Sequence, residues 1–276
     1  MNVTELNRRF ADALERIRAT KPLVHHITNH VVMNDTANVT LHVGALPVMA
    51  HAAEEAAEMT GLAGALVLNI GTLSPAWVEA MLLAGHRANE LGIPVVLDPV
   101  GAGATAYRTE TSLRLLGGLR VAMVRGNSGE IGALSGAGGV VRGVESVEGV
   151  ADPAAAAGVL AHRYNTVTVI TGRRDIVTDG GRVLVVNNGH EWLTTITGSG
   201  CMATALVAAF AAVEPDFLVA AGGALAAYGL AAELAAREAR GPASFRTALL
   251  DRIYNLTPEQ VAEGARAEFL RQHPPA

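Results

Sequence analysis

The only cysteine of the 276-residue chain, Cys201, lies in the segment Thr197–Ala203 (TGSGCMA), directly before a long run of apolar residues. The segment predicts the first turn of a helix. A helix N-terminus offers unpaired backbone N–H groups and a partial positive charge, and glycines there let an anion approach closely. Gly198, Ser199 and Gly200 are therefore predicted to form an anion hole that suits a phosphoryl group in transfer.

The same positive field predicts a lowered pKa for the Cys201 thiol, which could then accept a proton from a substrate hydroxyl. A buried structural cysteine beside a tight turn is the alternative interpretation, and the local sequence favours neither.

Two carboxylates could hold a divalent cation. Asp98 follows an apolar strand and precedes the glycine-rich run VGAG, which suits Mg²⁺ bound through water and phosphate oxygens; a turn or cap aspartate is the alternative. Glu130 stands three residues after Asn127. This spacing places both on one face of a helix, but it is also the spacing of a capping box. The histidines at 25, 26 and 30 fit no common zinc pattern.

Glycine-rich segments in two places suggest a nucleotide site. Two classes of nucleotide-binding enzyme have such segments, the dinucleotide-binding oxidoreductases and the enzymes that carry a Walker A loop. GAGATA (101–106) and GSGCMA (198–203) both read G-x-G-x-x-A, the pattern of dinucleotide-binding oxidoreductases, which requires a following strand that ends in an acid. The strand expected after the first ends in Arg125, which leaves only an NADP enzyme open. A Walker A loop is excluded, because the only lysine is Lys21 and Pro22 follows it.

These side chains need a scaffold to position them, and the pattern of apolar runs predicts an α/β fold with a mostly parallel sheet. The predicted strands are 23–28, 45–49, 65–70, 94–97, 120–124 and 167–171, followed by a hairpin of 175–179 and 182–186. The predicted helices are 3–19, 75–91, 153–164, 201–213, 215–239, 243–254 and 258–271. Residues 132–149 are predicted to be a surface loop, and no linker divides the chain, so one domain over 1–276 is expected.

Polar residues follow five of the predicted strands. Ligands of such sheets bind at the carboxyl ends of the strands, so we expect the polar residues there to line one crevice: Asn29, Asn69, Gly71, Asp98, Arg125, Asn127, Glu130 and Thr171. Met49 also follows a strand, and its thioether suits the wall of a pocket for a flat heteroaromatic ring.

Composition limits the partners and the compartment. One cysteine cannot form an internal disulfide, net charge is −5, and no basic cluster is present, so nucleic acid and anionic membrane are not expected as partners. The apolar run 217–232 is shorter than the roughly 20 residues that span a bilayer, and the N-terminus lacks the apolar core of a signal peptide. A cytoplasmic protein is expected.

Seven segments together resemble the hydroxyethylthiazole kinase family of the ribokinase-like fold. They are HHITNHVVMNDTAN (25–38), ALPVMA (45–50), LVLNIGTL (66–73), LDPVGAGATAYR (97–108), RGNSGEI (125–131), TVTVITG (166–172) and NGHEWLTTITGSGCM (188–202). The resemblance implies a central sheet with helices on both faces and a helical C-terminal third. One departure is Gly129, where many members carry serine.

The resemblance implies transfer of the ATP γ-phosphoryl group to the hydroxyl of 4-methyl-5-(2-hydroxyethyl)thiazole in thiamine salvage. It implies Cys201 as the base-like residue and residues 198–200 as the anion hole. Arg125 and Thr171 would contact ATP phosphates, and Met49, Asn29 and Gly198 would line the thiazole pocket. Asp98, Glu130 and Asn127 would hold Mg²⁺. It also implies a homotrimer with active sites between subunits. A hydroxymethylpyrimidine kinase of the same fold and the NADP oxidoreductase stay open as alternatives.

Overall fold

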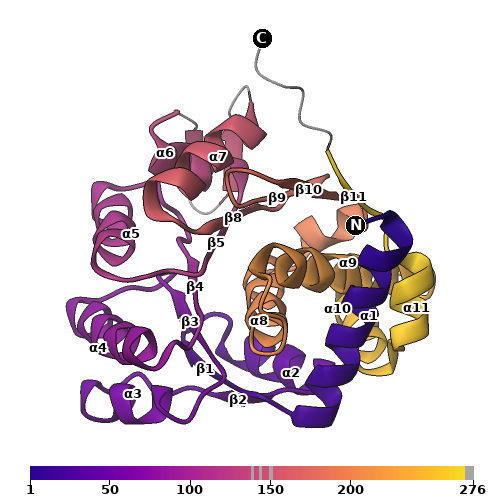
Figure 1. Ribbon diagram of the computed structural model, residues 1–276, viewed down its shortest axis with the longest axis horizontal. Helices are drawn as coiled ribbons and strands as arrows, with labels where there is room; N and C mark the ends of the chain where they lie inside the picture. Colours follow the sequence, from indigo (N-terminus) through magenta and orange to yellow (C-terminus); the bar gives the residue numbers. More distant parts are fainter. Residues whose placement is uncertain (138–139, 143–144, 149–151, 271–276) are drawn as a thin grey trace.

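A nine-stranded sheet runs through the centre of the molecule (Figure 1). The computed structural model describes residues 1–137, 140–142, 145–148 and 152–270. The order of the strands across this sheet is β11-β10-β9-β8-β5-β4-β3-β1-β2, and the six strands from β8 to β2 run parallel. The strands are β1 (Leu23–Ile27), β2 (Leu46–Val48), β3 (Ala65–Asn69), β4 (Val95–Asp98), β5 (Met123–Gly126), β8 (Val167–Ile170), β9 (Asp175–Thr178), β10 (Val183–Val186) and β11 (Ala267–Phe269).

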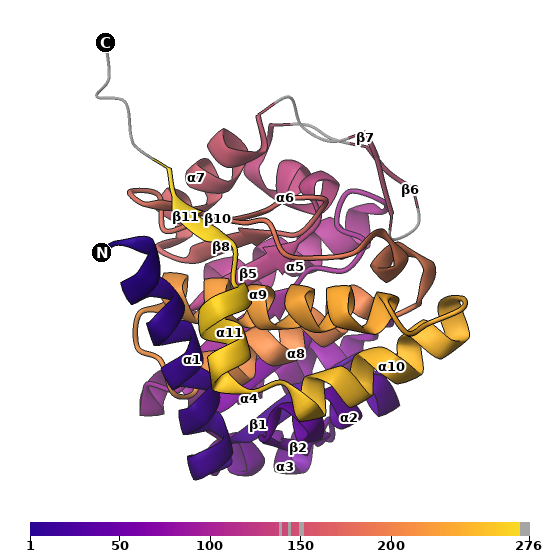
Figure 2. The same cartoon turned by 90° about the vertical axis from the view of Figure 1, so that its right-hand side faces the viewer.

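Helices cover both faces of this sheet (Figures 1 and 2). One face carries α3 (Ala53–Thr60), α4 (Pro75–Leu91), α5 (Ala106–Gly118), α6 (Ser128–Ser135) and α7 (Pro153–Tyr164). The other carries α1 (Val3–Thr20), α2 (Met33–Val43), α8 (Ser199–Ala211), α9 (Phe217–Ala236), α10 (Pro242–Asn255) and α11 (Pro258–Gly264). A short 3₁₀ helix, η1 (Glu191–Thr195), precedes α8. The prediction of an α/β fold with a mostly parallel sheet is confirmed.

Each face of the sheet has its own apolar core, because side chains alternate along a strand. In β3, for example, Val67 packs toward α8 and α9, whereas Leu66 and Leu68 pack toward α4. All five residues of β3 are buried. The apolar residues of this strand therefore occupy both of its faces, as expected of parallel strands covered on both sides.

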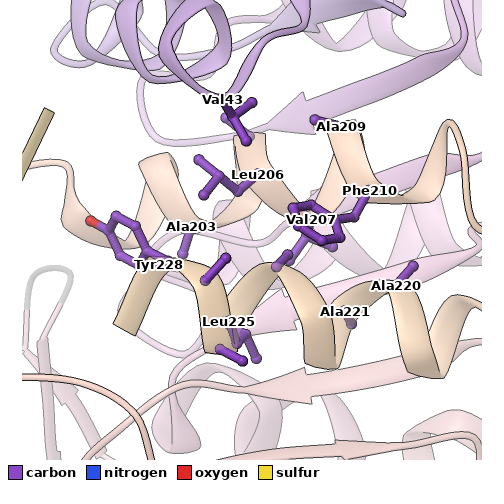
Figure 3. Packing of buried hydrophobic residues seen from close by; sticks show 14 of the residues in the cluster. Val43, Ala203, Leu206, Val207, Ala209, Phe210, Ala220, Ala221, Leu225 and Tyr228 are labelled. Carbon is purple, nitrogen blue, oxygen red and sulfur yellow. The ribbon is translucent and has the colours of Figure 1, made fainter. Parts of the chain in front are cut away.

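Helices α8 and α9 form the centre of the larger core and lie side by side (Figure 3). Small residues let α9 pack close to its neighbours. A Cβ atom at Gly222 would lie 2.3 Å from Leu184 of β10, and one at Gly223 would lie 3.0 Å from Phe10 of α1. Helix α9 is long and apolar enough to cross a membrane, but 83% of its most apolar window is buried inside the protein. Its composition is that of a core helix.

Local signals account for the element ends that were predicted well. Helix α4 spans Pro75–Leu91 as predicted, because Ser74 caps its first turn and Gly92 ends it in a left-handed conformation. The other predicted strands and helices through residue 254 occur within a few residues of the predicted bounds.

Two predictions of secondary structure were wrong. Residues 132–149 are not a loop throughout: α6 continues to Ser135, and β6 (Val140–Arg142) pairs with β7 (Glu145–Glu148) in a separate antiparallel sheet. The last predicted helix, 258–271, ends at Gly264, and β11 then pairs with β10 at the sheet edge. The apolar pattern of this segment reflects one buried helical face and one strand in succession.

Candidate active site

The polar residues that follow the parallel strands meet at one edge of the sheet, as predicted. The chain leaves β1 toward β2 on one side and returns to β3 on the other. Sheets of this kind bind ligands in a crevice at such a reversal of strand order, which here lies beyond the carboxyl ends of β1 and β3. Helix α8 starts beside this crevice, and its first turn contacts side chains from both strand ends.

Two asparagines hold the sulfur of Cys201. Asn29, two residues after β1, donates through Nδ2 to Asn69 Oδ1 at 2.8 Å and lies 3.7 Å from Cys201 Sγ. Asn69, the last residue of β3, lies closer to the sulfur, with its Nδ2 at 3.2 Å. Gly71 is needed beside them, because a Cβ atom there would lie 2.6 Å from Asn29 Nδ2. The predicted neighbourhood of Asn29 and Cys201 is therefore present.

Asp98 lies at the centre of the site and is fully buried. Its Oδ2 accepts hydrogen bonds from Asn69 Nδ2 at 3.0 Å and from Thr204 Oγ1 at 2.8 Å. Its Oδ1 has no hydrogen-bond partner among the described residues, and Arg125 Nη1 lies 3.8 Å away. Burial raises the pKa of Asp98, whereas Arg125 and these hydrogen bonds oppose the rise. One carboxylate oxygen is thus fixed and the other is left open.

Arg125 lies across the crevice from the asparagines, between β5 and α8. It donates to the hydroxyl of Thr171 after β8, and it is 9% exposed. Its guanidinium packs against Gly200, where a Cβ atom would lie 2.6 Å from Nη1. The glycine at position 200 therefore makes room for a cation at the helix N-terminus. The predicted pair of Arg125 and Thr171 is brought together at the anion hole.

Glu130 has the geometry of a helix start. Its Oε2 accepts from the Asn127 backbone at 2.8 Å, and Asn127 Oδ1 accepts from the Glu130 backbone at 2.9 Å, which completes a capping box. Its Oε1 accepts from the Gly101 backbone at 2.7 Å. Burial and the charge of Asp98 raise the pKa of Glu130 to about 7. Both carboxylate oxygens thus already hold backbone N–H groups.

The first turn of α8 has the form that an anion hole requires. The helix begins at Ser199, and Gly198 precedes it in a left-handed conformation with φ of 83° and no side-chain cap. The Ser199, Gly200 and Cys201 backbone N–H groups thus lie in the turn where no intrahelical acceptor exists. A Cβ atom at Gly198 would lie 2.9 Å from Val32, so only glycine fits this turn without strain.

The predicted lowering of the Cys201 pKa was wrong. Burial raises the pKa of Cys201 to about 12, and the charge of Asp98 raises it as well. Arg125 and the two asparagines act in the opposite direction but are weaker. The sequence indicated the favourable end of the helix but not the depth of the thiol or the carboxylate beside it. Cys201 is accordingly a neutral thiol at neutral pH.

Met49 is the predicted residue that stands furthest from this hydrogen-bonded group. It follows β2, the edge strand next to β1, and it is half-buried. His25 positions the adjoining residue, because its Nε2 donates to the Ala50 carbonyl at 2.7 Å. His26 is buried and contacts Thr40 at 3.3 Å. These two histidines of the sequence pattern thus serve packing and hydrogen bonding within the fold.

Sequence reasoning missed three residues of the site. Thr204 stands one helical turn after Cys201, and the 201/204 spacing could have indicated that it faces the same way. Tyr228 is a phenol within an otherwise apolar helix, and its hydroxyl donates to the Ser199 carbonyl at 3.0 Å. Arg108 lies inside the quoted segment 97–108 but was given no role.

The comparisons with known proteins agree with this geometry. Residues 14–259 match the model of the hydroxyethylthiazole kinase family. The chain is 92% identical to hydroxyethylthiazole kinase of Desulforudis audaxviator strain MP104C over 99% of this chain and 100% of that protein. A solved hydroxyethylthiazole kinase protein from Pyrococcus horikoshii OT3 superposes with a TM-score of 0.87 at 46% identity, covering 95% of this chain and 99% of that one.

A more distant likeness concerns the fold alone. A ribokinase-like superfamily protein from Enterococcus faecalis V583 superposes with a TM-score of 0.64 at 12% identity, over 90% of this chain and 95% of that one. The predicted ribokinase-like fold is therefore confirmed. The oxidoreductase alternative is not supported, because the family model and the relatives are those of a kinase. GSGCMA opens α8, which α9 follows without the strand that a dinucleotide site needs, and Arg125, the residue expected after GAGATA, contacts Thr171 and packs against Gly200. From its fold, its strand-end site and its close relatives, the chain belongs to the hydroxyethylthiazole kinase family.

Proposed function

We propose that the crevice at the carboxyl ends of β1, β3, β4 and β5 transfers the γ-phosphoryl group of ATP to the hydroxyl of 4-methyl-5-(2-hydroxyethyl)thiazole. Family membership makes the chain a kinase. The observation that carries the assignment to this crevice is the group formed by Asp98, Asn69 and Cys201, which lies against the uncapped N-terminus of α8. It joins a buried carboxylate, a proton-bearing group and an anion hole.

The residues of the site fit a Mg²⁺ ion. Asp98 Oδ1 is a buried carboxylate oxygen with no hydrogen-bond partner among the described residues, and Mg²⁺ prefers carboxylate, water and phosphate oxygens. Asp98 would hold the ion, and Glu130 and Asn127 would reach it through water, because their oxygens already accept backbone hydrogen bonds. A bound Mg²⁺ would neutralise charge on the β- and γ-phosphoryl oxygens.

The cationic side of the crevice would bind the polyphosphate. Arg125 and Thr171 stand beside Gly200, so a phosphate there meets the guanidinium, a hydroxyl and the first N–H groups of α8 together. Donors fixed before the reaction stabilise the charge that develops on a transferring group without any cost of reorientation. Arg125 itself is oriented by Thr171 and by the carboxylate of Asp98.

The opposite side would receive the alcohol. Asn29 and Asn69 orient the sulfur of Cys201, and the substrate hydroxyl would lie beside it, with the thiazole ring toward Gly198 and Met49. A neutral thiol does not deprotonate an alcohol before transfer. We propose that the proton leaves late, as the new O–P bond forms: Cys201 Sγ takes up the hydroxyl proton while the thiol passes its own proton to the Asp98 carboxylate, with which it is hydrogen-bonded.

The quaternary structure and compartment are part of the same proposal. We propose a homotrimer in the cytoplasm, with active sites between subunits, on the likeness to the family. Val31, which is 63% exposed and stands two residues after Asn29, is a position at which a subunit contact beside the site can be tested.

A coupled assay of ADP release tests the proposed reaction. We expect Mg²⁺-dependent ADP release with the thiazole alcohol. The value of kcat/KM for hydroxymethylpyrimidine should be at least about tenfold below the value for the thiazole alcohol, since one pocket group commonly discriminates by this much. Equal or higher efficiency with the pyrimidine would reassign the substrate. Absence of ADP release with both alcohols would contradict the kinase mechanism at this site.

A further inference from the structure

We infer that Arg108 is a positioning residue for phosphoryl transfer. It holds the loop after Asp98 by binding the carbonyl of the Val100–Gly101 peptide, and Glu130 binds the N–H of the same peptide. The expected effect on kcat rests on the proposed function. The hydrogen bonds of Arg108 and Glu130 do not depend on that function, because they involve no ligand.

The guanidinium of Arg108 donates hydrogen bonds to backbone carbonyl groups that follow two strands. Its Nη1 donates to the Val100 carbonyl at 2.7 Å and to the Ile70 carbonyl at 3.3 Å, and its Nη2 donates to the Gly71 carbonyl at 2.7 Å. Among the described residues, no carboxylate lies within ion-pair distance of Arg108. The cation therefore joins the segment after β3 to the segment after β4, and both segments follow residues of the site.

Glu130 contacts the same peptide group as Arg108. The carbonyl of Val100 and the N–H of Gly101 belong to one peptide unit, and in a trans peptide they point in opposite directions. Arg108 binds the carbonyl end, and Glu130 Oε1 accepts from the N–H end at 2.7 Å. The peptide is thus held at both ends, with a guanidinium donor on its carbonyl and a carboxyl acceptor on its N–H.

The contacts of Arg108 and Glu130 with the Val100–Gly101 peptide fix the path of the chain directly after Asp98. Gly101 has a φ of 77°, a left-handed conformation that a flexible loop would hold only part of the time. The other oxygen of Glu130 holds the Asn127 backbone at the start of α6, and Arg108 holds the residues after Asn69. The ends of β3, β4 and β5 are therefore tied together through one arginine, one peptide and one glutamate.

The planar fork of arginine suits this role better than lysine does. Two guanidinium nitrogens reach three carbonyl oxygens at fixed angles, whereas an ammonium group is a compact charge on a flexible stem. Loss of the fork should leave the core intact, because Arg108 is only half-buried. It should free the Val100–Gly101 peptide and, with it, the orientation of Asp98.

The test compares Arg108→Met and Arg108→Lys with Arg114→Met, a matched change of an exposed arginine on the same helix. In Arg108→Met we expect amide exchange of a peptide that contains Gly101 to accelerate at least about tenfold and kcat to fall about tenfold, while KM for the thiazole alcohol stays within about twofold. Arg108→Lys should lie between wild type and Arg108→Met. Arg114→Met should match wild type in every readout.

A double-mutant cycle supplies a readout that needs no activity. Because Arg108 and Glu130 act on one peptide, the changes of melting temperature in Arg108→Met and Glu130→Gln should not add, whereas those in Arg114→Met and Glu130→Gln should add. Additive changes for the first pair, or unchanged exchange at Gly101 in Arg108→Met, would overturn the inference. Absence of ATP turnover in the wild type would contradict the proposed function. In that case, amide exchange at Gly101 and the double-mutant cycle would still test whether Arg108 and Glu130 hold the Val100–Gly101 peptide.

Discussion

At the scale of single residues, Cys201 is the side chain whose role changed most between sequence and structure. Its position in the first turn of α8 was predicted, but its pKa is raised to about 12 instead of lowered. In the proposed mechanism the thiol accepts the late proton only while it passes its own proton to Asp98. It is not a preformed thiolate.

Substitution of Cys201 tests this role. We expect Cys201→Ala to lower kcat by roughly 10²-fold, the lower end of the effect of a general base, with little change in KM for ATP. We expect Cys201→Asp to stay within about tenfold of wild type, because a carboxylate there can accept the proton. Steady-state kinetics and melting temperatures of both variants measure this. A fully active Cys201→Ala beside an inactive but folded Cys201→Asp would rule out the role.

His26 makes the stability of the fold depend on pH. The ring is fully buried, and burial lowers the pKa of His26 to about 3. The unfolded chain binds a proton below about pH 6.5 that the folded chain does not bind, so stability falls as pH decreases. The expected loss is about 1.4 kcal/mol for each pH unit between about 6.5 and 3.

The measurement is the free energy of unfolding of wild type, His26→Gln and His86→Gln between pH 7 and 4. His86 is an exposed residue of α4 and serves as the control. The decline toward acid pH should be shallower in His26→Gln and unchanged in His86→Gln. Parallel declines in all three proteins would show that His26 does not titrate on unfolding.

Residue types at strand ends could be predicted, but their mutual contacts could not. The sequence marked Asp98, Asn29 and Arg125 because polar residues after apolar strands are informative. It could not show that Asp98 Oδ1 has no hydrogen-bond partner among the described residues or that Glu130 also accepts from the Gly101 backbone. Those facts depend on distances between segments 29 or more residues apart in the chain.

At the scale of elements, the approach of α8 to β5 decides what fits between them. Gly200 of α8 packs against the guanidinium of Arg125 from β5, and Thr204, one turn further, holds Asp98 of β4. The helix thus fixes a cation and an anion at the same time, which explains why small residues start it.

Gly200→Ala should displace Arg125 without unfolding the protein. The new methyl group would meet only the flexible end of a long side chain, at 2.6 Å, and alanine favours the helix by up to about 1 kcal/mol. We expect KM for ATP to rise about tenfold, which corresponds to about 1.4 kcal/mol of lost binding, with an unchanged melting temperature.

Gly158→Ala is the control, since a Cβ atom at this position of α7 would meet nothing within 4 Å. It should leave KM for ATP unchanged and the melting temperature equal or slightly higher. If Gly200→Ala bound ATP as wild type does, Arg125 would not be a phosphate ligand.

End signals account for some of the predicted elements but not for all: α5 was missed although Thr105 caps it, and α8 was predicted although it has no side-chain cap. Helix α4 has a serine cap, a proline and a terminal glycine. Helices α2 and α3, which lack a side-chain cap, were missed. The strand β11 was predicted as helix because its short apolar pattern does not distinguish the two, and only its pairing with β10 makes it a strand.

At the scale of the whole molecule, we propose that a neighbouring subunit contacts the site at the carboxyl ends of the strands. Val31→Asp should weaken a homotrimer and lower activity together, because a charge would be buried at the contact. Leu62→Asp is the control: Leu62 is 71% exposed but precedes β3, at the opposite edge of the sheet.

Light scattering of both variants, beside their activity, measures the effect. Wild type and Leu62→Asp should have three times the mass of one chain. A wild-type monomer with full activity would contradict the proposed assembly.

The central claim is that the crevice around Asp98 is the active site, and the kcat of Asp98→Asn beside its melting temperature tests it most directly. The change keeps the shape of the side chain but removes the buried charge. Because burial raises the pKa of Asp98, loss of that charge should leave the fold at least as stable. We predict that kcat with Mg²⁺, ATP and the thiazole alcohol falls at least about 10²-fold, with an equal or higher melting temperature. A folded Asp98→Asn protein with wild-type kcat would contradict the assignment.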